Sequence, residues 1–193
     1  MAGVLNLQKN DILDLTKAEP GLSKVMLGAG WDVVKKSGFF SFAKNYDLDL
    51  VALQIDNSGH LLNNGLIYFG HQSGVGIKLH GDNLTGEGDG DDEKISVDLT
   101  RLPSGCAKVV FAVTIYDAKV RKQSFSGVKN AYVRLLNEDK GGSEICRYNL
   151  SEDGGDNTAI IFAELERING NWQFKAKGEL LKASISTLAD MYR

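Results

Sequence analysis

AIIFAELERINGNWQFKAKGEL, residues 159–180, holds two runs of apolar, β-branched and aromatic residues on either side of the turn signal INGN. Residues of these kinds are typical of strands, and a short gap containing Asn-Gly is typical of a hairpin. We therefore expect two paired antiparallel strands, at 159–168 and 172–180.

Short apolar or alternating runs between turn signals recur along the rest of the chain. They predict further strands at 12–15, 22–30, 46–55, 66–69, 76–79, 94–99, 107–117, 131–138 and 144–150. Many short strands with regular turns predict one β-sandwich domain over residues 1–193, built from two mainly antiparallel sheets. Minor short helices are expected at 118–131 and at the C-terminus, where an apolar stripe has helical spacing: Leu181, Ile185, Leu188 and Tyr192.

The composition is that of a soluble globular protein, with 42% hydrophobic residues, 24% charged residues and a net charge of −3 over 193 residues. Nucleic acid is not expected as a partner, because binding it needs a basic face. No window has the length of a membrane span or the pattern of a signal peptide. Cys106 and Cys146 lack zinc spacing, so we interpret them as reduced core thiols of a cytoplasmic protein.

The sequence gives little support for an enzyme. No Ser-His-Asp or Cys-His arrangement is suggested by spacing, and the two cysteines are isolated. The basic run KVRKQ at 119–123 could contact nucleic acid or anionic lipid, but a solvated loop is favoured because its basic residues are few and no aromatic residues alternate with them.

The stretch GDNLTGEGDGDDE, residues 81–93, contains six carboxylates and four glycines. Without it the remaining chain would be mildly basic. A solvated loop is one interpretation, since most charge runs are solvated. A phosphate cradle fails on electrostatics and lacks the GxGxxG spacing. An acid–base catalytic pair needs two carboxylates in different environments, which this loop does not offer.

A hard-cation site is the favoured interpretation, because a bound cation removes the repulsion among the six charges. Ca²⁺ takes six to eight oxygen ligands in a flexible geometry. Glycines such as Gly88 and Gly90 let the chain curl so that carbonyl and carboxylate oxygens converge. The side-chain oxygens come from both ends of the loop: Asp82, Asn83, Asp89, Asp91, Asp92 and Glu93. The spacing is not that of an EF-hand.

Further acids follow or begin neighbouring strands. Asp47 and Asp49 lie two residues apart on one strand and share a face, and Asp32 follows the strand at 22–30. If these strand ends meet at one end of the sandwich, the oxygens suffice for two Ca²⁺ ions. The competing interpretation is an exposed strand end.

Several blocks in order resemble the TerD family of bacterial tellurium-resistance and general stress proteins: GLSKVMLGAGWD, YDLDL, HGDNLTGEGDGDDEKI, VVFAVTIYDA, FSGVKNAYVRLLN, EICRYNLSED and TAIIFAELERINGNWQFKAKGE. The segment VVKKSGFFSFAKNY resembles the TerZ branch more than TerD itself. The resemblance implies a β-sandwich with a paired calcium site, and it carries the family's conserved acids onto eight positions: Asp32, Asp47, Asp49, Asp82, Asn83, Asp91, Asp92 and Glu93.

The resemblance also implies a cytoplasmic, non-enzymatic protein of the tellurite-resistance (Ter) system. Other Ter proteins are the implied partners, in a membrane-associated assembly that this chain would join peripherally, without a transmembrane segment. A second hypothesis is an interaction scaffold in a Ter stress-response complex, in which the metal is only structural.

Overall fold

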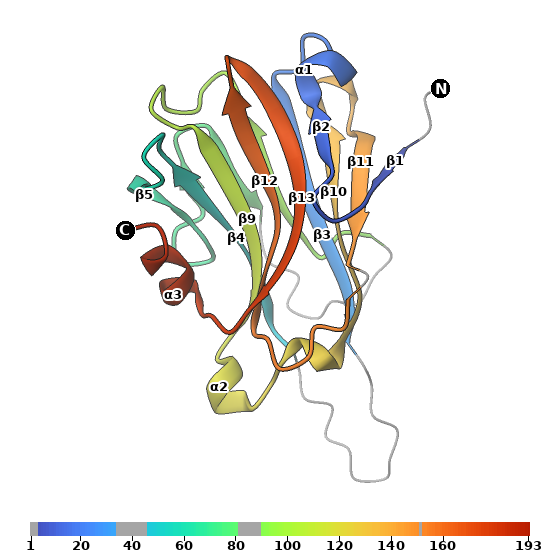
Figure 1. The fold of residues 1–193 in the computed structure, drawn as a ribbon, viewed down its shortest axis with the longest axis vertical. Helices are drawn as coiled ribbons and strands as arrows, with labels where there is room; N and C mark the ends of the chain where they lie inside the picture. Colours follow the sequence, from blue (N-terminus) through green and yellow to red (C-terminus); the bar gives the residue numbers. More distant parts are fainter. Residues whose placement is uncertain (1–3, 34–45, 81–89, 151) are drawn as a thin grey trace.

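Two packed β-sheets form the body of the protein in a computed structural model that describes residues 4–33, 46–80, 90–150 and 152–193 (Figure 1). Sheet A has the strand order β1-β11-β10-β3-β8-β7-β6, and sheet B has the order β2-β13-β12-β9-β4-β5. The predicted fold class, a β-sandwich of two mainly antiparallel sheets, is confirmed. Among the described strand pairs, β1 and β11 are parallel and the others are antiparallel.

The strands of sheet A are β1 (Leu5–Leu7), β3 (Lys24–Val33), β6 (Ser73–Gly74), β7 (Ile77–His80), β8 (Glu93–Asp98), β10 (Val128–Asn137) and β11 (Ser143–Asn149). Those of sheet B are β2 (Ile12–Asp14), β4 (Leu48–Ile55), β5 (Leu61–Ile67), β9 (Lys108–Ile115), β12 (Ala159–Ile168) and β13 (Asn171–Leu181). The short helices are α1 (Leu15–Ala18), α2 (Ala118–Arg121), η1 (Phe125–Gly127), η2 (Glu138–Lys140) and α3 (Ile185–Asp190).

The quoted hairpin forms as predicted. Strands β12 and β13 pair in antiparallel register from Ile168↔Asn171 to Ala159↔Leu181, and they join at a turn in which Asn169 and Gly170 both have positive φ. Positive φ at both central residues gives a turn whose twist matches that of the flanking strands, which explains the Asn-Gly pair.

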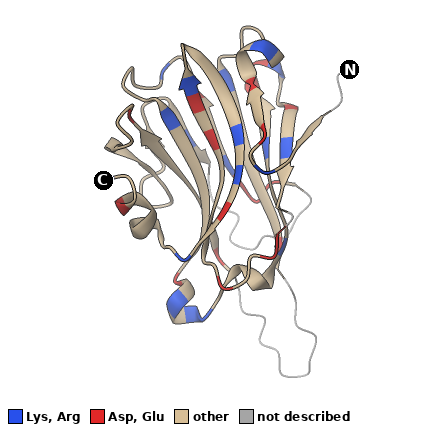
Figure 2. Ribbon diagram, in the orientation of Figure 1, with Lys and Arg blue, Asp and Glu red and all other residues tan. Residues whose placement is uncertain are grey.

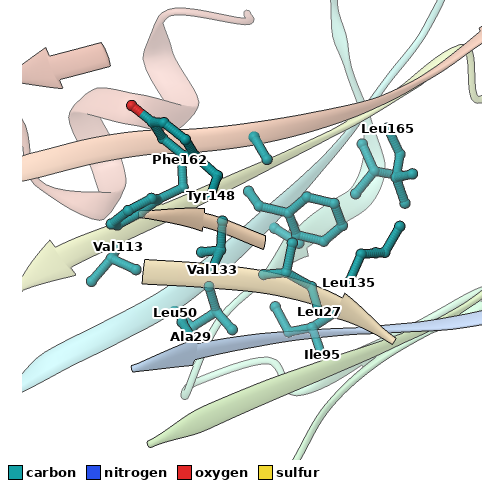
Figure 3. Close-up of a cluster of buried hydrophobic side chains, with 14 of the residues drawn as sticks. Leu27, Ala29, Leu50, Ile95, Val113, Val133, Leu135, Tyr148, Phe162 and Leu165 are labelled. Carbon is teal, nitrogen blue, oxygen red and sulfur yellow. The ribbon is translucent and has the colours of Figure 1, made fainter. Parts of the chain in front are cut away.

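The main core lies between the sheets, where alternate residues of each strand meet (Figure 3). Tyr148 from β11 and Phe162 from β12 pack edge to face across it, with ring centroids 6.4 Å apart. Such a pair contributes roughly 1 kcal/mol to stability, in addition to the contribution from the apolar area that the rings bury. Both cysteines are unpaired and buried, as the sequence predicted.

Sheet B is covered on both faces, which explains why every residue of β4 is buried. Leu50 and Ala52 belong to the core between the sheets, while Val51, Leu53 and Ile55 belong to a second apolar cluster that includes Leu188 and Ala189 of α3. The predicted C-terminal apolar stripe packs against this cluster. However, Leu181 belongs to β13, because the helix begins only at Ile185.

Other boundaries also differ from the predictions, and β1 and β6 were not predicted. The helix predicted over 118–131 is limited to α2 and η1, and β10 begins at Val128. Strand β5 begins at Leu61 rather than at 66, because it is an edge strand whose exposed Asn63 and Asn64 mask its pattern. Strands β1 and β6 are three and two residues long, too short to show a period.

The two thiols should be inert in the folded protein. Burial raises the pKa of Cys146 to about 12 and also raises the pKa of Cys106, and neither residue is solvent-exposed. Because the thiolate is the reactive form, we expect a thiol-specific reagent at pH 8 to modify fewer than one thiol in ten during an hour under native conditions. Both should react within minutes in denaturant, as measured by absorbance and mass spectrometry; fast native labelling would contradict this burial.

Candidate functional site

The predicted acids that the structure describes lie at or next to three strand ends: the end of β3 and the starts of β4 and β8. Strands β3 and β8 are antiparallel, with Ala29 opposite Glu93, so the residues that lead into β8 lie beside those that end β3. Asp82, Asn83, Gly88 and Asp89 lie outside the described residues. The remaining seven predicted site residues can each be placed.

Asp92 lies at the centre of this end, with 6% of its surface exposed. Its backbone N–H donates to the Ala29 carbonyl, and its carboxylate accepts from the Trp31 backbone N–H, both at 2.8 Å. Burial raises the pKa of Asp92; the bond from Trp31 lowers it, and the charges of Asp32 and Asp91 raise it further. The ionised form of Asp92 is thus costly without a cation beside it.

Asp91 has an ion-pair partner that the sequence analysis missed. Its side chain is 0% exposed, and its two oxygens accept from Nε and Nη2 of Arg134 at 2.7 and 3.0 Å. The hydroxyl of Tyr132 also donates to Asp91, at 3.2 Å. Both carboxylate oxygens of Asp91 are thus engaged by a guanidinium in a buried ion pair, and the predicted role of Asp91 as a calcium ligand stays a prediction.

Glycines in β3 make room for this ion pair. A Cβ atom at Gly28 would lie 2.2 Å from Oδ2 of Asp91, and one at Gly30 would lie 2.6 Å from the Tyr132 ring. No side chain can be accommodated there without displacing these groups. The sequence carried a signal for this, because two glycines at i and i+2 in one strand leave space on one face for something large.

Glu93 is buried and reaches from sheet A to sheet B. It is 4% exposed, and its Oε2 accepts a hydrogen bond from the backbone N–H of Leu50 in β4. A buried carboxylate in this position joins the two sheets at the end where the acids gather. Its predicted role as a calcium ligand stays a prediction.

Asp49 of β4 lies on the face of sheet B that is turned away from sheet A. Asp49 is buried opposite Thr114 and alternates with Leu48 and Leu50, so it shares the face of the α3-covered cluster. Asp47 is partly exposed and lies 3.6 Å from Nη1 of Arg121. Asp49 thus points away from Asp91, which lies against the outer face of sheet A.

Two further residues complete the described set. Asp32 is exposed at the end of β3, where its Oδ2 accepts from Nδ2 of Asn130 at 2.7 Å. Gly90 has φ +137°, a conformation that L side chains rarely adopt, so the entry to β8 requires glycine. The prediction that glycine shapes this loop is therefore physically justified at position 90.

Calcium chemistry fits the donors at this end only in part. Asp32 and Asp92 offer hard oxygen ligands beside the pair of Arg134 with Asp91 and Glu144, and one guanidinium cannot balance all of these carboxylates, which leaves local negative charge for a cation to balance. Within the described ranges, however, no group of three or more His, Cys, Asp or Glu side chains has the geometry to hold a metal ion. The remaining predicted ligands would have to come from the residues outside those ranges.

Comparison with known proteins gives the family. A model of the TerD domain matches residues 3–192. The chain belongs to the TerD domain family. It is 41% identical over 191 residues to general stress protein 16U of Bacillus subtilis, covering 97% of this chain and 96% of that protein.

Other relatives extend the comparison without separating the branches. Tellurium resistance protein TerZ of Serratia marcescens is 40% identical over 195 residues, covering 98% of this chain and 95% of that protein. This value does not exceed the identity to 16U, so it does not single out the predicted TerZ-like branch. The crystal structure of a TerD homologue from Streptomyces coelicolor A3(2) aligns with a TM-score of 0.68 at 22% identity, over 90% of this chain and 99% of that chain, and supports the fold.

One further property concerns membranes. Among the residues that the structure describes, no helix of this TerD-family protein is both long and apolar enough to cross a bilayer.

Proposed function

We propose that this TerD-family protein is a non-enzymatic, calcium-binding stress protein of the tellurite-resistance system, acting in the cytoplasm. The observation that carries the proposal is the buried Asp92 carboxylate, which lies in the field of Asp32 and Asp91, while Arg134 pairs with Asp91 and Glu144. Named relatives in tellurium resistance and general stress support the biological setting.

Asp32 and Asp92 are the described residues that would hold calcium. When bound, the ion supplies positive charge that offsets the repulsion between these carboxylates. The N–H of Trp31 orients Asp92, and the N–H of Leu50 orients Glu93. Because Glu93 joins the two sheets, a cation that steadies the entry to β8 also steadies the packing of the sheets.

A non-catalytic role is supported by the state of the candidate nucleophiles. Cys106 and Cys146 are buried with raised pKa values, so neither presents a thiolate to a substrate. Two unpaired thiols are also what a reducing compartment maintains, which supports the proposed cytoplasmic location.

Calcium titration calorimetry tests the proposal. Wild-type protein stripped of metal should give heat that saturates with calcium, and Asp92→Asn should weaken the binding at least tenfold. Asparagine retains an oxygen that can accept from Trp31, so the variant removes charge rather than fold. Asp153→Asn, in an exposed turn between β11 and β12, is the matched control. Absence of binding heat in wild-type protein would refute the proposal.

The second candidate function is an interaction scaffold whose metal is only structural. It is favoured by the ion pair of Asp91 with Arg134, because the guanidinium already binds both oxygens of this predicted ligand. If a calcium-free Asp92→Asn protein retained full tellurite resistance in cells, the scaffold would be the better description. Other Ter-family proteins would then be the partners to seek by co-purification.

A further inference from the structure

A basic and apolar projection lies at the same end of the sandwich as the acids. Helix α2 is a single turn held by its buried Ala118, and the residues on either side of it, Asp117 and Lys122, both have positive φ. This tight turn presents Val120 outward with 80% of its surface exposed. An apolar side chain so far out of the fold contributes little to the core.

Two exposed aromatic rings continue the projection toward sheet B. Tyr116, 38% exposed, follows β9, and Phe69, 43% exposed, follows β5. Their ring centroids are 5.7 Å apart, and the guanidinium of Arg121 lies 5.0 Å from the Tyr116 ring. The contacts make Phe69, Tyr116 and the α2 turn one continuous surface, which we call the α2 tip.

The charge of the α2 tip is positive. Lys119 and Lys122 are exposed on either side of Val120, and Figure 2 shows the basic residues of α2 gathered at this projection. Arg121 is partly neutralised by Asp47, at 3.6 Å, and Asp117 is the acid at the start of the turn. The two lysines and Arg121 outnumber these two acids.

We propose that the α2 tip docks onto an anionic lipid surface. A projecting apolar side chain between lysines, with aromatic rings behind it, matches the interfacial layer of a bilayer, where apolar groups enter and cations meet headgroup phosphates. A peptide partner usually fills a groove, whereas the α2 tip projects outward (Figure 1). A solvated loop is the prediction from the sequence, because no aromatic residues alternate with the charges of 119–123; the rings of Phe69 and Tyr116 come from outside that run.

Vesicle co-sedimentation tests the docking with the full-length protein. We expect wild-type protein to bind phosphatidylcholine vesicles containing 30% phosphatidylserine, to bind pure phosphatidylcholine at least tenfold more weakly, and to lose binding in high salt. Each Lys or Arg near an anionic surface contributes about a fivefold gain, so Lys119→Gln/Lys122→Gln should lower binding about 25-fold. Val120→Asp should lower it at least tenfold.

Val75→Asp is the matched control, because Val75 is 61% exposed beside β6, on the opposite sheet. Near-ultraviolet circular dichroism of each variant shows that the fold is intact. All assays are run with calcium and with chelator, since calcium bridging to lipid would not depend on Val120. The proposal is overturned if wild-type protein does not bind anionic vesicles, or if Val120→Asp and Val75→Asp bind them equally. It is also overturned if the α2 tip binds polyglutamate, an acidic peptide, but does not bind vesicles. None of these results bears on the calcium titration calorimetry, so the lipid proposal and the calcium proposal can fail separately.

Discussion

Arg134→Leu should lower the free energy of unfolding by about 3 kcal/mol, and this loss should disappear largely in Arg134→Leu/Asp91→Asn. The reason is that removing one partner of a buried pair leaves the other charge without compensation, which costs about 3–5 kcal/mol. Asp91 has a side chain that is 0% exposed, whereas Arg134 is 25% exposed, so the lower end of that range applies. Urea denaturation followed by circular dichroism measures both variants.

Arg147→Leu is the control for this prediction. Arg147 lies directly opposite Arg134 in the β10–β11 register and bonds to Glu144, at 29% side-chain exposure. It also lies 4.5 Å from the Tyr132 ring, so its loss should cost about 1 kcal/mol or less. If added calcium fully restored Arg134→Leu, Asp91 would belong to the metal site after all, as the sequence predicted.

Calcium should raise the stability of the wild-type protein, and it should leave the stability of the Asp92→Asn variant almost unchanged. A ligand that binds only the folded state at 100 times its dissociation constant contributes about 2.7 kcal/mol, which for a chain of this size raises the melting temperature by roughly 5–10 °C. In the presence of chelator, the stability ranking of the two proteins should reverse. There, Asp92→Asn should equal or exceed wild-type stability, because it removes a buried charge that lies beside Asp32 and Asp91.

Differential scanning calorimetry measures the melting temperatures of wild type and Asp92→Asn, with calcium and with chelator. Wild type should melt higher in calcium, and Asp92→Asn should melt at the same or a higher temperature in chelator. Asp153→Asn should follow wild type in both conditions, because it changes an acid in an exposed turn. If calcium shifted neither melting temperature, the site would have no energetic role. If it shifted both equally, Asp92 would not be a ligand.

The fold could be predicted largely from local patterns, because strands of a sandwich alternate or run apolar and end at Gly, Asn and Asp. The hairpin of β12 and β13 shows this best, since its two strands and its turn are adjacent in sequence. The pairing of β1 with β11 could not be predicted, because three residues of β1 carry no period and their partner lies more than a hundred residues away.

The sequence predicted which strand ends come together but not the directions of their side chains. The acids at 32, 47, 49 and 81–93 predicted that these strand ends meet, and β8 does contact both β3 and β4. What the sequence did not show is that Asp91 turns toward Arg134 while Asp49 turns to the other face of sheet B. Such directions depend on register between strands distant in sequence, for which one chain gives no local signal.

The order of strands in sheet A also sets when each part of the protein can form during synthesis. β1 is made first but pairs with β11, and β3 lies between β8 and β10. At roughly 5–20 residues per second, the ribosome needs on the order of ten seconds to pass from Leu7 to Ser143. Until β10 is made, the edge of β3 that pairs with it has no hydrogen-bonding partner, and such an unpaired edge can pair with another chain.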